Sequence, residues 1–229
     1  MMENLRINRI VELSGHHDTV ADIGTDHGFT SLLLLRTGRA TKVIATDISS
    51  DSLSKARRLF EQEGVQDLTE CRTGDGLDVL EAGEADACII SGMGGHLIMK
   101  MLERDMDKVR AMDRLVLSPQ SNIPEFRQGL MRNGLHVSVE TAVFENDHFY
   151  TVFVAHGHGE PVVYTEEELL TGKSGLIYDR KGYEGYISHL VEKNRRMLSY
   201  SLSSKRRMEL ERENSILENF KHLLNGEQN

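Results

Sequence analysis

Two aspartates flank a glycine in a loop near the start of the chain. The segment Asp22-Ile23-Gly24-Thr25-Asp26-His27-Gly28 lies between an apolar run typical of a strand and a helical pattern. Such loops often bind dinucleotides, but Gly-x-Gly-x-x-Gly is absent, and carboxylates at Asp22 and Asp26 would repel a pyrophosphate. Carboxylates favour a cation instead. S-adenosylmethionine carries an ammonium and a sulfonium, so the loop predicts this cofactor, with glycines that allow close backbone approach.

Acidic loops also follow the next two predicted strands. Asp47 ends the run Val43–Thr46, where a carboxylate can accept both hydroxyls of a ribose. Gly74-Asp75-Gly76 follows the third run, and an acid there can accept a hydrogen bond from an adenine amine, with the glycines keeping a slot clear for the ring. Either aspartate could instead cap a helix, a role worth about 1 kcal/mol. Three acidic loops after three successive strands favour the cofactor interpretation.

The carboxylate of the methionine moiety needs a cationic partner. Arg9 lies on a predicted opening helix, where Leu5, Ile10 and Leu13 recur at helical spacing. This arginine could reach the carboxylate from just before the first strand. The alternative is an ordinary solvated helix residue.

The fourth loop, Ser91-Gly92-Met93-Gly94-Gly95, indicates the kind of atom that is methylated. Many amino-group methyltransferases have Asn/Asp-Pro-Pro-aromatic at this position, which accepts hydrogen bonds from an exocyclic amine. That tetrapeptide is missing here. A ring nitrogen such as N1 of adenine already has an in-plane lone pair, so positioning is most of the catalytic task. The glycines would leave room for a flat ring; otherwise the loop is a simple strand–helix turn.

Histidines near the first loop do not predict a metal site. His16, His17 and Asp18 lie close to Asp26-His27 in sequence, but no His-x-x-x-His or Cys-x-x-Cys spacing is present. We interpret His27 as lining the methyl-transfer cleft. A later loop, Ser118–Asn122, offers amides that could bind a base edge, or it is a proline-shaped turn.

The elements that must position these loops alternate between short apolar runs and helical patterns. Five such runs end near residues 23, 46, 73, 90 and 117, which predicts parallel strands with crossover helices. Beyond Asn133-Gly134, the runs His136–Phe144 and Phe149–Ala155 predict a β-hairpin that closes the sheet. The ligand is therefore expected at the carboxyl ends of the strands of an open α/β sheet.

A second region follows the breaker cluster at residues 156–161. We assign residues 1–159 to a catalytic domain and 160–229 to a C-terminal helical domain. Apolar residues at three-four spacing from Tyr183 to Leu224 predict two long helices with a turn at Ser199–Ser204, although one unbroken helix would give the same pattern.

Composition restricts the class of protein. The chain has 229 residues, of which 39% are hydrophobic and 28% charged, and a mean hydropathy of -0.38, values typical of a globular protein. No apolar run approaches the roughly 20 residues of a membrane span, and residues 1–9 lack a secretory signal. We expect a cytoplasmic protein, with Cys71 and Cys88 as buried free thiols.

The charge distribution points to one anionic partner. A net charge of -9 argues against indiscriminate binding of nucleic acid. Between residues 193 and 207, however, six bases occur without an acid, a stretch that could hold a phosphate backbone or form a solvated helix face. The candidate RNA-binding residues are Lys193, Arg195, Arg196, Lys205, Arg206 and Arg207.

The chain resembles the bacterial tRNA (adenine-22-N1)-methyltransferase family over nearly its whole length. The resemblance is carried by the motifs Asp-Ile-Gly-Thr-Asp-His-Gly, Gly-Asp-Gly-Leu and Ser-Gly-Met-Gly-Gly and by the appended helices. The resemblance implies a Rossmann-like class I methyltransferase sheet with a C-terminal, coiled-coil-like helical domain. It also implies methylation of N1 of adenine 22 in tRNA, with S-adenosyl-L-homocysteine as the product. Where much of the family has Leu-Gln-Pro-Asn, this chain has Leu117-Ser118-Pro119-Gln120, so an amide is displaced along the loop and the resemblance does not specify the base contacts.

These arguments define the expected site. The catalytic candidates are Asp26, His27, Met93 and Gly94. The cofactor-binding candidates are Arg9, Asp22, Gly24, Thr25, Asp26, His27, Gly28, Asp47, Ile48, Gly74, Asp75, Gly76, Gly92 and Met93. We expect a monomer that binds tRNA, without a metal or a membrane. The alternatives are a methyltransferase for another RNA, a protein or a small metabolite, and a non-catalytic RNA-binding or cofactor-sensing module.

Overall fold

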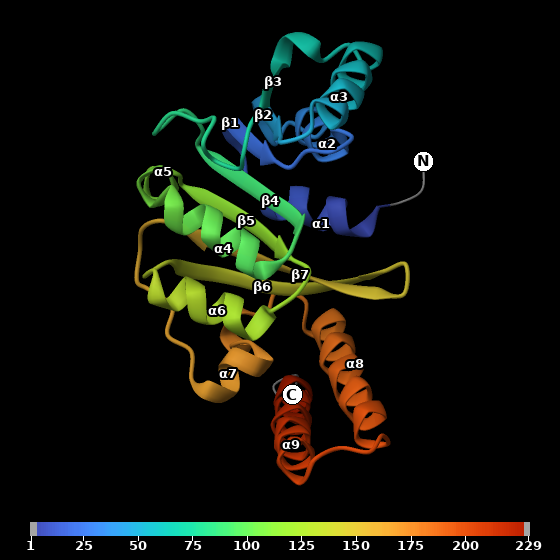
Figure 1. Ribbon diagram of the computed structural model, residues 1–229. Coiled ribbons are helices and arrows are strands. Elements are labelled where there is room, and N and C mark those ends of the chain that lie inside the picture. Colours follow the sequence, from blue (N-terminus) through green and yellow to red (C-terminus); the bar gives the residue numbers. More distant parts are fainter. Residues whose placement is uncertain (1–3, 227–229) are drawn as a thin grey trace.

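A single seven-stranded sheet organises the molecule in the computed structural model, which describes residues 4–226 (Figure 1). The strand order is β3-β2-β1-β4-β5-β7-β6; β1 to β5 are parallel, and β7 is antiparallel to both of its neighbours. The strands are β1 (His17–Ile23), β2 (Ala40–Asp47), β3 (Thr69–Thr73), β4 (Ala87–Met93), β5 (Arg114–Pro119), β6 (His136–Glu145) and β7 (His148–His156). The predicted α/β architecture is confirmed.

Helices cover both faces of the sheet. The helices α1, α2 and α3 pack on one face, and α4, α5 and α6 pack on the other. Their bounds, with those of the C-terminal helices, are α1 (Leu5–Leu13), α2 (Phe29–Arg36), α3 (Ser50–Gln62), α4 (Gly95–Arg104), α5 (Met106–Ala111), α6 (Ile123–Arg132), α7 (Glu166–Thr171), α8 (Arg180–Leu198) and α9 (Ser204–Gly226). Because both faces are covered, the inner strands are continuous apolar runs rather than alternating ones.

The hairpin predicted after residue 134 is present. β6 and β7 are joined by Asn146 and Asp147, which have φ angles of 49° and 62°. Two successive residues with positive φ give a turn whose twist matches that of the paired strands, and Asn and Asp tolerate this conformation better than most residues.

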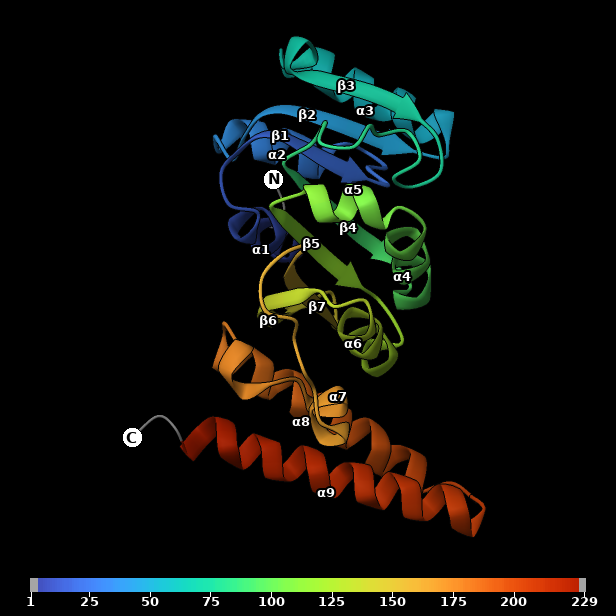
Figure 2. The same ribbon diagram turned by 90° about the vertical axis from the view of Figure 1, so that its left-hand side faces the viewer.

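The segment from Arg180 to Gly226 forms two helices rather than one. The helices α8 and α9 lie side by side below the sheet edge (Figure 2), and a break at residues 199–203 separates them, as predicted. Tyr183, Tyr186 and Ile187 of α8 pack with Leu217 and Phe220 of α9. The helix α8 also packs on β6, so the pair is attached to the antiparallel edge of the sheet.

A buried ion pair joins the sheet to these helices. Arg127 of α6 contacts Glu140 of β6 at 2.9 Å, and both side chains are almost fully buried. The Arg127 guanidinium also donates to the Tyr183 hydroxyl at 2.7 Å, and the Tyr164 hydroxyl donates to Glu140 at 2.7 Å. Val162 and Tyr164 belong to the core of the sheet. The chain beyond residue 159 is therefore integrated into the core, and a division there stays a prediction.

The remaining expectations from composition concern thiols and membrane spans. Cys88 is buried, Cys71 is half-buried, and both are free. Within residues 4–226, no helix has the length and apolar character needed to cross a bilayer.

Candidate active site

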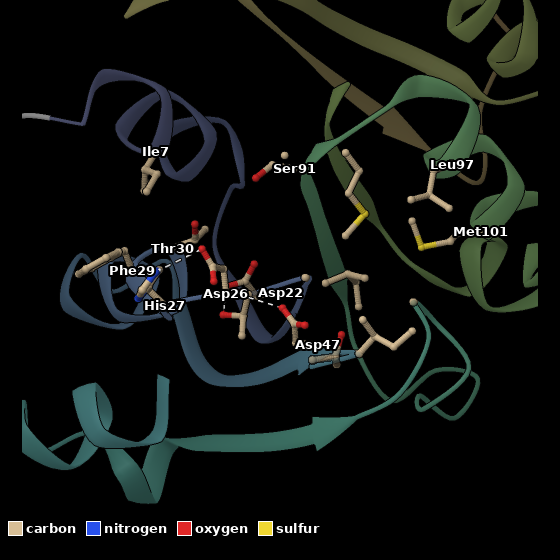
Figure 3. Close-up of a pocket in the computed structure, with 18 of the residues that line it drawn as sticks. Ile7, Asp22, Asp26, His27, Phe29, Thr30, Asp47, Ser91, Leu97 and Met101 are labelled. Atoms are coloured by element: carbon tan, nitrogen blue, oxygen red, sulfur yellow. Dashed lines mark hydrogen bonds and ion pairs between the residues drawn. The ribbon is translucent and has the colours of Figure 1, made fainter. Parts of the chain in front are cut away.

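A cavity of about 690 Å³ opens where the parallel strands end. It is lined by the loops after β1, β2, β3 and β4 and by the start of α1. Figure 3 shows the side chains of Asp22, Asp26 and Asp47 gathered on one side of this space, with Leu97 and Met101 of α4 on another. The predicted site residues that line it are Asp22, Gly24, Thr25, Asp26, His27, Asp47, Ile48, Gly74, Asp75, Gly76, Gly92 and Met93.

Asp22 holds the first loop in shape. Its carboxylate is buried and accepts hydrogen bonds from the Thr25 hydroxyl at 2.8 Å and the Ser31 hydroxyl at 2.6 Å. Burial raises the pKa of Asp22 above its ordinary value, while the two hydroxyls act in the opposite direction. This acid therefore ties the start of α2 to the end of β1 as well as lining the cavity.

Asp47 is oriented by backbone amides. Its two carboxylate oxygens accept from Ser49 N at 2.8 Å and from Asp26 N at 3.2 Å. The helix α3 is capped by Ser49, whose side chain accepts from Ser52 N, so Asp47 is not the cap. The carboxylate is half-buried at the cavity wall, in a position suited to accept hydroxyl groups.

Asp26 and His27 form the exposed rim of the cavity. Asp26 has a φ of 49°, a conformation that is uncommon outside glycine and that turns its side chain away from the loop core. The His27 Nε2 atom lies 3.6 Å from the Asp26 carboxylate, and the imidazole stacks on Phe29 with ring centroids 5.9 Å apart. Both side chains are about half exposed or more, at 65% for Asp26 and 48% for His27.

Asp75 has an unforeseen partner. Arg104, at the end of α4, donates to the Asp75 carboxylate at 2.9 Å and to its carbonyl at 2.7 Å. No helix begins at Asp75, so it is not a cap. Sequence reasoning missed Arg104 because nothing in the spacing of residues 75 and 104 indicates that α4 returns to this loop.

Backbone hydrogen bonds join the fourth loop, which follows β4, to the fifth loop, which follows β5. Gly95 N donates to the Ser121 carbonyl at 3.1 Å, and Gln120 N donates to the Met93 carbonyl at 2.9 Å. A Cβ at Gly95 would lie 2.6 Å from the Ser121 carbonyl, and one at Gly94 would lie 3.1 Å from the Ser121 hydroxyl. These two glycines permit close backbone approach; they do not clear space for a ring, as the sequence had suggested. Gly94 does not line the cavity.

Other glycines also pack against side chains. Gly28 precedes α2, and a Cβ there would meet the Phe60 ring at 2.8 Å, so this residue faces α3 and not the cavity. The Cβ directions of Gly74 and Gly76 are filled by Val79 and Met101. Only the backbones of Gly74 and Gly76 are therefore available to line a slot for a ring.

Arg6, rather than Arg9, lines the cavity. Arg9 contacts Glu12 at 3.3 Å and Asp179 at 3.7 Å and lies over the Tyr178 ring, outside the cavity. The Arg6 Nε atom is buried and has no hydrogen-bond partner among residues 4–226. The two arginines are three positions apart on one helix, and only the packing of α1 against the sheet decides which one faces the ligand.

Comparisons with known proteins agree with this geometry. A family model described as a methyltransferase domain matches residues 3–153. The tRNA (adenine(22)-N(1))-methyltransferase of Bacillus subtilis is 32% identical over 167 residues, which are 73% of this chain and 70% of that protein. This chain belongs to the tRNA (adenine(22)-N(1))-methyltransferase family. The predicted family is thereby confirmed.

Two solved structures share the fold of this family member. TrmK from M. capricolum, in complex with S-adenosyl-homocysteine, has a TM-score of 0.84 at 18% identity and covers 98% of this chain and 100% of its own. The M1A22 tRNA methyltransferase TrmK of B. subtilis has a TM-score of 0.73 at 24% identity and covers 96% of each chain. Because the matches extend over the whole length, they include the C-terminal helices.

The groups around the cavity fit S-adenosylmethionine. Four carboxylates, from Asp22, Asp26, Asp47 and Asp75, line it beside a single arginine. Such a donor set offers acceptors for ribose hydroxyls and amines and a negative potential for a cationic ligand. The Arg6 guanidinium, which lies over the Tyr150 ring at 4.7 Å, is a cationic group of the lining that suits a carboxylate. In residues 4–226, no three His, Cys, Asp or Glu side chains are grouped so that they could hold a metal ion.

The basic stretch of residues 193–207 is partly neutralised in the fold. Arg195 contacts Glu218 at 2.8 Å, and Arg206 contacts Glu209 at 3.1 Å and Glu213 at 3.4 Å. The acids that the stretch lacks in sequence are thus supplied mainly by α9. Within the described chain, Lys193, Lys205 and Arg207 have no acidic partner.

Proposed function

We propose that this chain transfers the methyl group of S-adenosylmethionine to N1 of adenine 22 in tRNA. The relative from B. subtilis carries this activity in its name and matches most of the chain. The observation that carries the proposal is that acids from three separate loops, together with Arg6, line one cavity.

Each group at the cavity has a role that follows from its position. Asp47, held by two backbone amides, accepts the ribose hydroxyls of the cofactor. Asp75, held by Arg104, accepts the adenine amine, and Arg6 binds the methionine carboxylate. When bound, the cofactor supplies a methyl group on a sulfonium, which a ring nitrogen can attack directly.

The protein positions the target base and stabilises its charge. N1 of adenine presents a lone pair in the ring plane, so the chain needs no strong base to activate it. Asp26 and His27 line the same cavity as Met93, whose side chain lies against Gly24, and their exposed rim is where the base enters. The methylated base is cationic, and the exposed Asp26 carboxylate is available to stabilise it; alternatively, Asp26 only orients the loop. Gly94 contributes by holding the fourth loop against Ser121.

The C-terminal helices are the element that docks tRNA. Lys193, Lys205 and Arg207 supply cations for the phosphate backbone, and the arginines paired with acids can exchange partners because their ion pairs are exposed. We further propose that the chain acts as a cytoplasmic monomer, with a catalytic domain at residues 1–159 and a docking domain at 160–229.

Mapping of methylated adenosine in tRNA tests this function. Purified protein, S-adenosylmethionine and a tRNA transcript should give a primer-extension stop at position 22, and a transcript with guanine at that position should give none. Methylation elsewhere in the tRNA would overturn the assignment of the position. Binding of S-adenosylhomocysteine without any RNA methylation would favour a protein or metabolite substrate, or a sensing module.

A further inference from the structure

A second cavity of about 510 Å³ lies beside the first. It is lined by residues of the loop between β5 and α6, of the β6–β7 turn, of β7 and of α8; Figure 1 labels these strands and helices. Gln120 lines both cavities, and its backbone N donates to the Met93 carbonyl in the methyl-transfer loop. An occupant of the second cavity would therefore lie next to the reacting base.

The walls of this cavity are aromatic. The Phe149 ring of β7 lies 5.4 Å from the His189 ring and 6.0 Å from the Tyr186 ring, measured between centroids. Tyr186, His189 and Lys193 recur at three- and four-residue spacing, so α8 presents them on one face. Phe149 and His189 are only half-buried, which leaves ring surface available for a flat ligand.

The lining also includes hydrogen-bonding groups, one cation and apolar side chains such as Ile123, Leu170 and Leu190. The amides of Gln120 and Asn122 and the imidazole of His148 lie at the cavity, and Lys193 provides an ammonium. The carboxylate of Asp147 is also present and can accept an amine or a hydroxyl. Burial and the nearby Arg196, Lys193 and His148 lower the pKa of His189, which favours the uncharged ring.

We propose that the second cavity binds an unpaired nucleotide adjacent to the target adenosine, with its base stacked on Phe149 and His189 and its phosphate beside Lys193. This inference rests on the proposed tRNA methylation and identifies a subsite for it. Stacking on aromatic rings with a cation at the backbone is how proteins bind unstacked nucleotides, and the amides of Gln120 and Asn122 can reach a base edge. Extrusion of a second base also stabilises the open RNA from which the target is taken.

Steady-state kinetics of the Phe149→Leu variant test whether a base stacks on the Phe149 ring. This variant keeps an apolar side chain of similar volume but lacks a ring. We expect KM for tRNA to rise about tenfold with kcat nearly unchanged, since a flanking nucleotide contributes to binding rather than to chemistry. Phe144→Leu is the matched control, because Phe144 pairs with Phe149 across the hairpin but does not line the cavity. Equal KM values for both variants and the wild type would overturn the proposal.

Abasic substrates identify the nucleotide. A tRNA lacking the base on one side of the target should show the same rise in KM with the wild type, and no further rise with Phe149→Leu. If the rise in KM caused by the missing base and the rise caused by Phe149→Leu add at both flanking positions, the proposed subsite is overturned. Failure of the wild type to methylate intact tRNA at position 22 would instead refute the proposed function. Affinity for S-adenosylhomocysteine and the melting temperature, measured for every variant, show whether each is folded.

Discussion

Two regions carry groups of like charge: the edge at which the parallel strands end, and the helical tail formed by α8 and α9. The fold treats these two groups differently. At the sheet edge, Asp22 and Asp26 of the first loop, Asp47 of the second and Asp75 of the third converge on one cavity. In the tail, six bases lie between residues 193 and 207 without an acid among them, but α9 provides acids for Arg195 and Arg206. A stretch of like charges in sequence is thus partly neutralised in the fold, and a spatial cluster need not be local in sequence.

The difference has a geometric cause. Parallel strands end at the same edge of a sheet, so the loops that follow them converge whatever the intervening helices contain. A helix, in contrast, distributes successive residues around its axis, and the charge on each face depends on what the partner helix presents. The grouping of charged side chains in space can therefore be predicted from the sequence at the edge where the parallel strands end, but not on the helical tail.

Removing the buried ion pair that links the sheet to the helical tail should have the largest effect, which is a loss of stability. Arg127→Met leaves Glu140 buried without its cation, which we expect to lower the free energy of unfolding by about 3 to 5 kcal/mol. Urea denaturation measures this. The double variant Arg127→Met, Glu140→Leu should recover part of the loss, because no buried charge then remains. A single variant as stable as the wild type would show that the two regions are not coupled through this pair.

At the sheet edge, Asp47→Ala should weaken the binding of S-adenosylhomocysteine about 100-fold, since a charged acceptor of two hydroxyl hydrogen bonds is lost. Isothermal titration calorimetry provides the measurement. Asp51→Ala is the control, because Asp51 is an exposed acid on the neighbouring helix α3. Unchanged affinity in Asp47→Ala would mean that this carboxylate only shapes the loop through Ser49 N and Asp26 N.

The two arginines of α1 provide a sharper comparison. Arg6→Ala should reduce the affinity for S-adenosylhomocysteine about tenfold, because a charge-assisted hydrogen bond is lost. Arg9→Ala should leave the affinity close to that of the wild type, since Arg9 is occupied by Glu12 and Asp179 outside the cavity. The reverse result would restore Arg9 as the partner of the cofactor carboxylate.

The smallest effects are expected on the tail. Lys193→Ala with Lys205→Ala should weaken tRNA binding a few-fold at moderate salt and lower the slope of log affinity against log salt by about 1 to 2. The paired arginines should matter less, so Arg195→Ala with Arg206→Ala should change the slope by less than the lysine pair does. Filter binding over a range of salt concentrations tests this order. A larger change for the arginine pair would show that their ion pairs open on the RNA.

The sequence predicted the order of strands and helices and most of the cavity residues. Buried parallel strands give continuous apolar runs, and Asn146-Asp147 marks the hairpin turn. The break near Ser199–Ser204 was also foreseen. These features depend on residues close together in sequence, or on the rule that parallel strands end at one edge.

The amino-acid sequence by itself determined the chemistry at the end of each strand, because each loop is fixed by its own strand and glycines. The tertiary structure alone decided that Arg6 lines the cavity in place of Arg9, that Arg104 holds Asp75, and that the glycines after Met93 admit the backbone of Ser121. Each of these contacts joins side chains or backbones from elements whose packing angle and register no local pattern specifies. The aromatic cavity between β7 and α8 is of the same kind, since neither element forms it alone.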